Sequence, residues 1–396
     1  MKVISDHNLN LKGKKVLLRV DLNVPMKNGA ISETSRIEKI IPTIKLLLEK
    51  QAKIIILSHI GRPKGNIVKG MSLEPISKKL SSLINQEIIF NNKAINEISI
   101  SEVNNIQNSS IMMLENIRFN KGEEANDEKF SKEISNLGDI YVNDAFSVSH
   151  RSHASVEGVT KFIPSYYGLQ ITEEIDALKK ITSEIKKPIT LIMGGSKIST
   201  KIKIINNLIK KFDNIIIVGG MANTLLKHSG KKIGKSICEN NCGDLIKEIL
   251  KNSKKYNCEI TYPIDVVVSK SIDSFGNNKD INDINEDDII LDIGKKTIDN
   301  IKAIINKTNT VLWNGPAGYF ESPNFQEGTK QILEIISQRA DNKNIFSVAG
   351  GGETVAAINK FNKINSFTFV STAGGAFLEY LEGKTLPGIK ALNQNV

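Results

Sequence analysis

Arginine is scarce in this chain and is concentrated in its first half. Six of the 53 basic residues among the 396 are arginines, and the other 47 are lysines. Five of the six precede residue 152: Arg19, Arg36, Arg62, Arg118 and Arg151. A guanidinium group can bind phosphate or carboxylate through two parallel hydrogen bonds, which a lysine ammonium cannot do. This distribution predicts that the first half of the chain binds an anionic ligand.

The residues that follow short apolar runs differ between the two halves. In the first half they are polar: Asp21, Asn23, His59, Arg62, Asn116, Arg118, Asp144, His150, Arg151 and His153. In the second half they are glycines, grouped at 194–195, 219–220, 350–352 and 374–375. Glycines at the start of a helix let backbone N–H groups approach a phosphate at the positive end of the helix dipole. The two halves together are predicted to bind two phosphorylated ligands.

One repeated arrangement of elements would position both sets of residues. Eleven short apolar runs have strand character: 15–25, 52–63, 110–119, 139–146, 188–197, 214–221, 261–270, 288–294, 310–318, 344–353 and 366–375. Helical periodicity appears between many of them, for example over 33–50 and 197–212. Near-continuous apolar strands that alternate with helices are typical of parallel sheets covered on both faces.

The number of runs bears on the number of domains. Eleven strands are too many for one comfortable open sheet. The sequence therefore predicts an α/β protein with two doubly wound, Rossmann-like parallel-sheet domains, joined by a hinge helix over 168–181. In such sheets ligands bind beyond the carboxyl ends of the strands, which is where the arginines and glycines fall.

Composition excludes several broad classes of protein. The chain is 40% apolar and 24% charged, which argues against disorder. No run approaches the ~18 apolar residues of a membrane-spanning helix. Three cysteines in so long a chain do not make a disulfide framework, so we expect a soluble protein of a reducing, intracellular compartment. The net charge of +10 leaves nucleic acid and anionic metabolites open as partners.

Common catalytic motifs do not account for the sequence. The segment Gly230-Lys-Lys-Ile-Gly234-Lys235-Ser236 has three residues between its glycines where a P-loop has four. No nucleophile with a general base can be assembled from the motifs. Some phosphoryl transfers need only positioning and charge neutralisation, so the lack of such a pair is compatible with a phosphotransferase.

Nine motifs together resemble the phosphoglycerate kinase family. Four lie in the first half: Arg19-Val-Asp21-Leu-Asn23-Val-Pro25, Ser58-His-Ile-Gly-Arg62-Pro, Leu114-Glu-Asn-Ile-Arg118-Phe, and Asn143-Asp-Ala-Phe with His150-Arg-Ser-His153-Ala-Ser. Five lie in the second half: Gly194-Gly-Ser-Lys197-Ile-Ser-Thr-Lys201, Trp313-Asn-Gly-Pro-Ala-Gly-Tyr-Phe-Glu321, Gly350-Gly-Gly-Glu-Thr354, Thr372-Ala-Gly-Gly-Ala-Phe-Leu-Glu379 and Leu386-Pro-Gly388. They follow the order of the family, so the resemblance covers essentially the whole chain.

The resemblance implies a reaction and a division into domains. Residues 1–170 would form a phosphoglycerate-binding domain, on which a C-terminal tail of about 384–396 packs, and residues 171–383 a nucleotide-binding domain. The family transfers the acyl phosphate of 1,3-bisphosphoglycerate reversibly to ADP, with Mg²⁺, and gives 3-phosphoglycerate and ATP. These metabolites would be the partners of a monomeric, cytoplasmic enzyme that binds neither nucleic acid nor membrane.

The resemblance also assigns roles to residues at matching positions. The substrate-binding residues would be Asp21, Asn23, Arg36, His59, Arg62, Arg118 and Arg151. The catalytic residues would be Arg36, Lys197, Gly351 and Gly352. The nucleotide-binding residues would be Lys197, Lys201, Gly219, Gly220, Asn314, Glu321, Gly350, Gly351, Gly352, Glu353 and Thr354. Arg19 and His153 are expected to support the site without contacting the ligand.

Departures from the family pattern leave some details open. Glu353 stands where the family usually has aspartate; we expect it to be the metal ligand, with capping of the following helix as the alternative. Val218 replaces a glycine beside the expected adenine pocket, and the segment 168–181 differs from the common hinge helix. Two other functions are also considered: a basic RNA-binding protein, and a catalytically inert scaffold with the same fold.

Overall fold

The chain folds into two compact units. The structure is a computed structural model that describes residues 1–27, 30–98, 100–342 and 344–394. One unit comprises Met1–Ile175 with Thr385–Val396, and the other comprises Asp176–Lys384. The boundary between them falls within helix α6 (Leu169–Thr182), which confirms the helix predicted over 168–181.

The first unit is built on a six-stranded sheet in which every adjacent pair is parallel. Its strand order is β5 (Ile88–Asn91), β6 (Ile111–Leu114), β4 (Lys53–Leu57), β1 (Lys15–Arg19), β7 (Ile140–Asn143) and β8 (Ser165–Tyr167). Strands β1, β4, β6 and β7 coincide with predicted apolar runs, whereas β5 and β8 are strands that the sequence analysis missed.

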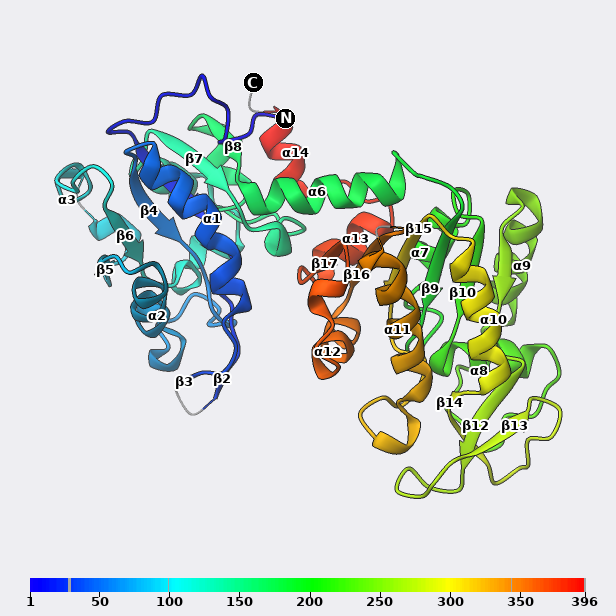
Figure 1. Ribbon diagram of the computed structural model, residues 1–396. Coiled ribbons are helices and arrows are strands. Elements are labelled where there is room, and N and C mark those ends of the chain that lie inside the picture. The colour runs from blue at the N-terminus through cyan, green and yellow to red at the C-terminus, as the bar shows by residue number, and fades with distance from the viewer. Residues whose placement is uncertain (28–29, 99, 343, 395–396) are drawn as a thin grey trace. The chain divides into compact units, whose positions relative to one another are not determined.

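Helices cover this sheet through their apolar faces. They are α1 (Ser35–Glu49), α2 (Glu74–Ile84), α3 (Ile100–Asn104), α4 (Lys121–Glu124), α5 (Glu128–Ser135) and α14 (Pro387–Gln394). On α1, Ile37, Ile40 and Ile44 belong to the buried core, and burial of each such side chain contributes about 1.5–3 kcal/mol. Helix α14 lies beside β8 in Figure 1, where the Tyr167 hydroxyl donates to the carbonyl of Ile389 over 3.1 Å.

The second unit has a similar parallel sheet of six strands. The strand order is β11 (Glu259–Thr261), β10 (Asn214–Ile217), β9 (Ile189–Met193), β15 (Thr310–Asn314), β16 (Phe346–Gly350) and β17 (Phe369–Ser371). Its core includes Trp313, which is fully buried. Two such sheets with interleaved helices confirm the predicted α/β fold class.

Two of the predicted strands lie outside the parallel sheets. Strands β12 (Asp265–Ser269), β13 (Asn277–Asp280) and β14 (Ile289–Ile293) form a separate antiparallel sheet in the order β13-β12-β14. A parallel connection needs a crossover of a dozen or more residues, usually a helix. The segments between these three strands contain no α-helix in the described residues, so an antiparallel arrangement results. A two-stranded hairpin, β2 (Met26–Lys27) with β3 (Ala30–Ile31), completes the strands.

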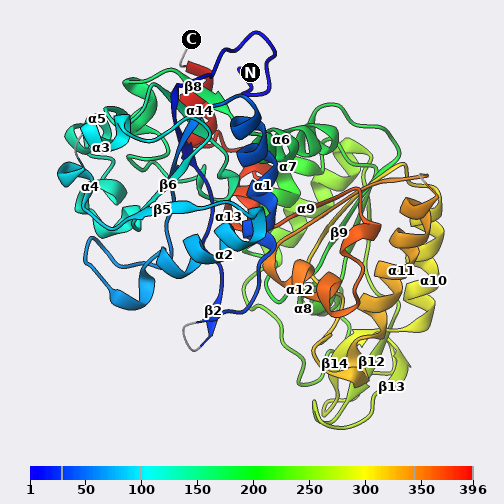
Figure 2. The same cartoon turned by 60° about the vertical axis from the view of Figure 1, so that its left-hand side comes forward.

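The helices of the second unit are α7 (Ile202–Leu208), α8 (Gly219–His228), α9 (Gly243–Tyr256), α10 (Lys295–Asn306), α11 (Glu327–Asp341), α12 (Gly352–Lys360) and α13 (Gly375–Leu381). Figure 2 shows α10 and α11 side by side along one face of the sheet. Helix α7 is shorter than the predicted 197–212, because residues 197–201 continue the loop after β9. In the described part of the chain, no helix has the length and apolar character needed to cross a membrane.

Candidate active site

The arginine-rich motifs of the first unit meet at one edge of its sheet. Asp21 follows β1, His59 follows β4, Arg118 follows β6 and Arg151 follows β7. Because these strands are parallel, their carboxyl ends lie at the same edge. The topology therefore gathers residues that are far apart in the sequence.

Asp21 contacts two other predicted residues, Arg36 and Asn23. Its carboxylate is buried, and Oδ2 accepts from Nη1 of Arg36 over 2.5 Å. Oδ1 accepts from the backbone N–H of Asn23 over 3.0 Å. The hydroxyl of Ser147 also donates to Oδ2, over 2.5 Å. Ser147 was missed by the sequence analysis, although it lies between the two parts of the fourth motif.

The turn after β4 joins the remaining residues to this cluster. The backbone N–H of Gly61 donates to Oδ1 of Asn23 over 2.9 Å. The carbonyl of Gly61 accepts from Nη1 of Arg118 over 2.8 Å. Gly61 lies between the buried His59 and the exposed Arg62, so this one turn carries both predicted residues.

Electrostatics also indicate an anion site. Burial lowers the pKa of His59 well below its ordinary value, and the positive charges of Arg19 and Arg118 lower it further. Burial likewise lowers the pKa of Arg118, with Arg19 and Arg151 contributing, although Glu124 and Glu123 oppose the shift. Apart from burial, nearby positive charges lower the pKa values of His59 and Arg118, so several cations lie close together. Such a cluster attracts a ligand of negative charge. The loops at this edge of the sheet and the adjacent helix α1 thus carry the predicted substrate-binding residues of the first unit, of which Arg62 and Arg151 are exposed.

A pocket of about 250 Å³ lies at the carboxyl edge of the second sheet. It is lined by Gly194, Gly195, Ser196, Lys197, Thr200, Lys201, Asn314, Gly315, Gly351, Gly352, Glu353, Thr354 and Leu378. Apart from Leu378 on α13, these residues lie at or after the ends of β9, β15 and β16, which are neighbours in the sheet. Most of the predicted nucleotide-binding residues thus surround one cavity, which we name the phosphate pocket.

Asn314 connects the walls of the phosphate pocket. Its Oδ1 accepts from Nζ of Lys201, and its Nδ2 donates to the carbonyl of Gly350 over 2.6 Å. Next to it, the N–H of Gly315 donates to Oγ1 of Thr354 over 2.7 Å. Burial lowers the pKa of Lys201, while the nearby charge of Glu353 opposes that shift. Lys201 and Glu353 are therefore neighbours of opposite charge.

Gly351 is the N-cap residue of helix α12, which begins at Gly352. Its φ of +98° is a conformation that side chains other than glycine rarely adopt. A Cβ atom here would also lie 2.5 Å from Nδ2 of Asn314. The glycine thus lets the backbone turn into α12, whose first N–H groups are unpaired within a helix and carry the positive end of its dipole.

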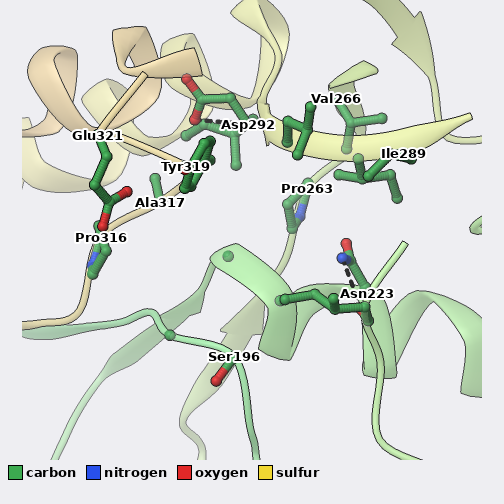
Figure 3. A pocket seen from close by; sticks show the side chains of 18 of the residues that line it. Ser196, Asn223, Pro263, Val266, Ile289, Asp292, Pro316, Ala317, Tyr319 and Glu321 are labelled. Carbon is green, nitrogen blue, oxygen red and sulfur yellow. Dashed lines mark hydrogen bonds between the residues drawn. The ribbon is translucent and has the colours of Figure 1, made fainter. Parts of the chain in front are cut away.

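A second pocket of about 340 Å³ lies nearby (Figure 3). Gly219, Gly220 and Glu321, predicted for nucleotide binding, line it together with apolar side chains such as Val266 and Ile289. Glu353 lines both cavities, so we name this one the adjoining pocket. Its apolar walls are typical of a site for a flat, largely uncharged ligand group.

Several residues of the adjoining pocket were missed by the sequence analysis. Figure 3 shows Tyr319 and Asp292 on one wall and Asn223 on another. Tyr319 could have been found, because it lies in the same short motif as Asn314 and Glu321. Burial raises the pKa of Asp292 to about 7, although the N–H groups of Gly328 and Ile293 oppose the shift.

Protein side chains alone do not form a metal centre in the described ranges. No group of three His, Cys, Asp or Glu side chains there could hold a metal ion. The three cysteines, Cys238, Cys242 and Cys258, are free.

An anion site on one α/β unit and a glycine-lined pocket with an apolar neighbour on the other are the arrangement expected of a phosphotransferase that uses a nucleotide. The family model described as phosphoglycerate kinase matches residues 6–384. Phosphoglycerate kinases of Chelativorans sp. and Caulobacter vibrioides are 43% and 42% identical to this chain, and each match covers 97% of both proteins.

Solved structures agree with the sequence comparisons. The phosphoglycerate kinase of Coxiella burnetii has a TM-score of 0.91 at 39% identity and covers 98% of each chain. The enzyme of Pyrococcus horikoshii has a TM-score of 0.83 at 29% identity and covers 100% of this chain and 99% of its own. The chain belongs to the phosphoglycerate kinase family, and it is a phosphotransferase of glycolysis. Nothing in these matches supports an RNA-binding protein or an inert scaffold.

Proposed function

We propose that the two units divide the ligands of the reaction between them. The first unit binds the triose, as 1,3-bisphosphoglycerate or 3-phosphoglycerate, and the second binds ADP or ATP. The observation that carries this proposal is the separation of the two kinds of site. Buried and exposed guanidinium groups gather on one unit, whereas the glycine turns and both pockets lie on the other. This division also corresponds to domains at 1–170 and 171–383 with a tail at 384–396.

On the first unit, each residue has a role that fits its surroundings. Arg62 and Arg151 are exposed, so their guanidinium groups can bind the phosphate of the triose. Asp21 and Asn23 hold Arg36 and the turn after β4 in position. Arg118 and His59 complete the binding site, and Arg36 binds both the substrate carboxyl and the group being transferred.

On the second unit, the phosphates lie in the phosphate pocket and the base in the adjoining pocket. Lys201 and the N–H groups of the turn over 350–352 bind the phosphates, and Asn314 and Thr354 hold that turn in shape. Gly219 and Gly220 leave room for the nucleoside, and Glu321 binds the ribose hydroxyls.

A single carboxylate in the phosphate pocket suits Mg²⁺. This ion is usually held by one or two carboxylates together with substrate phosphates and water. Glu353 is exposed at the start of α12 and lines both pockets, so its carboxylate fits this donor set. Bound Mg²⁺ would neutralise charge on the nucleotide phosphates.

The chemistry needs no general base. The attacking oxygen is an already ionised phosphate or carboxylate, so the transition state mainly requires positive charge around the transferred group. That charge comes from Arg36, from Lys197, and from the N–H groups of Gly351 and Gly352 at the N-terminus of α12. Water has to be excluded during the transfer, because an acyl phosphate otherwise hydrolyses.

The same proposal covers the state of the enzyme. It acts as a monomer in the cytoplasm, and it binds neither nucleic acid nor membrane.

A coupled assay with 3-phosphoglycerate, ATP and Mg²⁺ tests the activity. We expect turnover that requires all three, and a lack of turnover in a folded preparation would refute the function. Size-exclusion chromatography with light scattering tests the monomer.

A further inference from the structure

Arg19, the last residue of β1, is a fully buried cation in which each of the three guanidinium nitrogens has one hydrogen-bond partner. Its Nε donates to Oγ of Ser155 over 2.9 Å, and its Nη1 donates to the carbonyl of Val20. Its Nη2 lies 3.2 Å from Nδ1 of His59. A buried charge is tolerated only when it is hydrogen-bonded and compensated. The contact with His59 is therefore one of three that fix the orientation of this guanidinium.

The contact determines which nitrogen of His59 carries a proton. A guanidinium group has donors only, so Nδ1 of His59 has to be the acceptor. A neutral imidazole that accepts at Nδ1 carries its proton on Nε2. An imidazolium would direct a second N–H at the guanidinium. The low pKa of His59, which arises from burial and then from Arg19 and Arg118, agrees with a neutral ring.

The charge of Arg19 is balanced through Ser155 by the buried carboxylate of Glu123. Oγ of Ser155 accepts from Arg19 and donates to Oε1 of Glu123 over 2.6 Å. The N–H of Ser155 donates to Oε2 of Glu123 over 2.9 Å. Burial by itself would raise the pKa of Glu123, but His153, Arg19 and Ser155 hold it below its ordinary value. A buried carboxylate thus faces the buried cation through one hydroxyl.

We infer that Arg19 is a positioning residue that holds His59 as the neutral Nε2–H tautomer, so that His59 offers the triose an uncharged hydrogen-bond donor. Within the described residues, the ring nitrogen of His59 that has a protein partner is Nδ1. The buried side-chain atoms without a partner do not include Nε2 of His59, so this nitrogen is accessible. Nε2 is therefore left for solvent or a ligand oxygen. The inference rests on the proposed function, in which His59 contacts the triose.

This arrangement gives His59 a function that the neighbouring arginines do not have. The arginines attract any anion, because their charge acts over a distance. A neutral donor acts only at hydrogen-bond range and in one direction. His59 would therefore select for the position of an oxygen on the triose, while adding no charge to a crowded group of cations.

Long-range ¹H–¹⁵N NMR spectra of the full-length protein distinguish the tautomers of histidine directly. The exposed rings of His7 and His228 serve as references in the same spectrum, and a His59→Gln variant assigns the His59 signals. We expect Nδ1 of His59 to remain unprotonated, with the proton on Nε2, from about pH 5.5 to about pH 8. A proton on Nδ1 anywhere in this range would overturn the inference, whatever the ligand affinity.

Variants of Arg19 test whether Arg19 determines the tautomer of His59. In Arg19→Met, which has no donor for Nδ1, His59 should become protonated within this range or populate both tautomers, and the Kd for 3-phosphoglycerate should rise roughly tenfold, as for one lost hydrogen bond. A His59 spectrum unchanged in this variant would contradict the role of Arg19. If Arg19→Met does not fold, Arg19→Met with Glu123→Gln removes both buried charges, and the wild-type spectrum still decides the tautomer.

The proposed contact between His59 and the triose can be refuted independently of the tautomer of His59. If His59→Gln and His59→Ala both bind 3-phosphoglycerate with wild-type affinity, His59 does not contact the triose, and the proposed substrate site is wrong in this respect. The NMR spectrum would then still report whether Arg19 sets the tautomer.

Discussion

Arg36 donates to the buried carboxylate of Asp21 over 2.5 Å, and this ion pair orients the first turn of helix α1 toward the end of strand β1. The guanidinium is only partly buried, with 28% of its side-chain surface exposed, whereas Asp21 has 8%. One edge of Arg36 is thus held by the protein. A planar group held in this way can bind a second anion in a fixed direction, which is the role proposed for it here.

Substitution of Arg36 by lysine tests the need for a planar group. Arg36→Lys keeps the positive charge but cannot bind Asp21 and the transferred group together. We expect kcat to fall by ~10²-fold or more, since arginines that act on a transferred phosphoryl group are worth ~10³–10⁵. The melting temperature should change little. Arg339→Lys, on α11 of the other unit, is the matched control and should retain wild-type kinetics. Wild-type turnover in Arg36→Lys would refute the role.

Asp21 should contribute to catalysis by orienting the guanidinium of Arg36. In Asp21→Asn the side chain keeps its size but loses the charge that orients the guanidinium. We expect kcat/KM for 3-phosphoglycerate to fall about tenfold, the effect of losing roughly 1.4 kcal/mol. Steady-state kinetics of Asp21→Asn, Arg36→Lys and the double variant test this, because residues that act through one contact are not additive. Fully additive losses would show that Asp21 acts independently.

Glu353 should determine the response to magnesium. If its carboxylate is a ligand of Mg²⁺, Glu353→Gln raises the free Mg²⁺ needed for half-maximal activity, roughly tenfold for one charge-assisted contact. Affinity for 3-phosphoglycerate should stay nearly constant. Glu353→Asp, which restores the usual residue of the family, should remain active. The measurement is activity against free Mg²⁺ at saturating nucleotide. An unaltered magnesium curve with a lower melting temperature would instead make Glu353 a helix cap.

Asp144 should make the first unit less stable as the pH rises. Its carboxylate is buried where α6 begins, and accepts from Thr43 over 2.5 Å and from the N–H of Ile171 over 3.1 Å. Burial raises its pKa to about 6, although these hydrogen bonds oppose the shift. Between its unfolded pKa near ~4 and about 6, the folded state holds a proton that the unfolded chain has lost. The contribution of Asp144 to stability is therefore full below pH ~4 and falls as the pH rises to about 6, by roughly 3 kcal/mol.

An asparagine at this position imitates the protonated carboxyl group. It can accept from Ile171 and donate to Thr43, whatever the pH. Hydrogen exchange of peptides from the first unit should show Asp144→Asn equal to wild type near pH ~4 and more stable above pH ~6. Asp6→Asn, at an exposed position, is the control. A constant difference between Asp144→Asn and wild type across this range would contradict a raised pKa.

The sequence predicts those parts of the fold that have a strong local pattern. Strands such as β4 and β9 have five residues each, four of them apolar, and both are evident in the sequence. Strand β8 has three residues, and β5 is half-buried, so neither has a pattern that distinguishes it from a loop. The antiparallel pairing of β12 with β14 depends on the connection between them, which apolar runs alone do not reveal.

The same limit applies to the site. The predicted binding residues lie within short motifs, and their positions after strands bring them to the right edge of each sheet. Glu123 is different, because in the segment Lys121-Gly-Glu-Glu124 it is indistinguishable from a surface charge. Only the tertiary structure reveals that it is buried behind Ser155 and Arg19. Ser147 and Asp292 were likewise missed because their partners are distant in sequence.

The division of ligands between the two units is tested most directly by one set of calorimetric titrations. 3-Phosphoglycerate and Mg-ADP are each titrated into wild type, Arg62→Gln and Lys201→Met. Arg62 is exposed and Met keeps the apolar stem of Lys201, so both variants should fold. We expect Arg62→Gln to weaken 3-phosphoglycerate by about tenfold or more and to leave Mg-ADP unchanged, with the reverse for Lys201→Met. Loss of Mg-ADP affinity in Arg62→Gln, or of 3-phosphoglycerate affinity in Lys201→Met, would contradict the division.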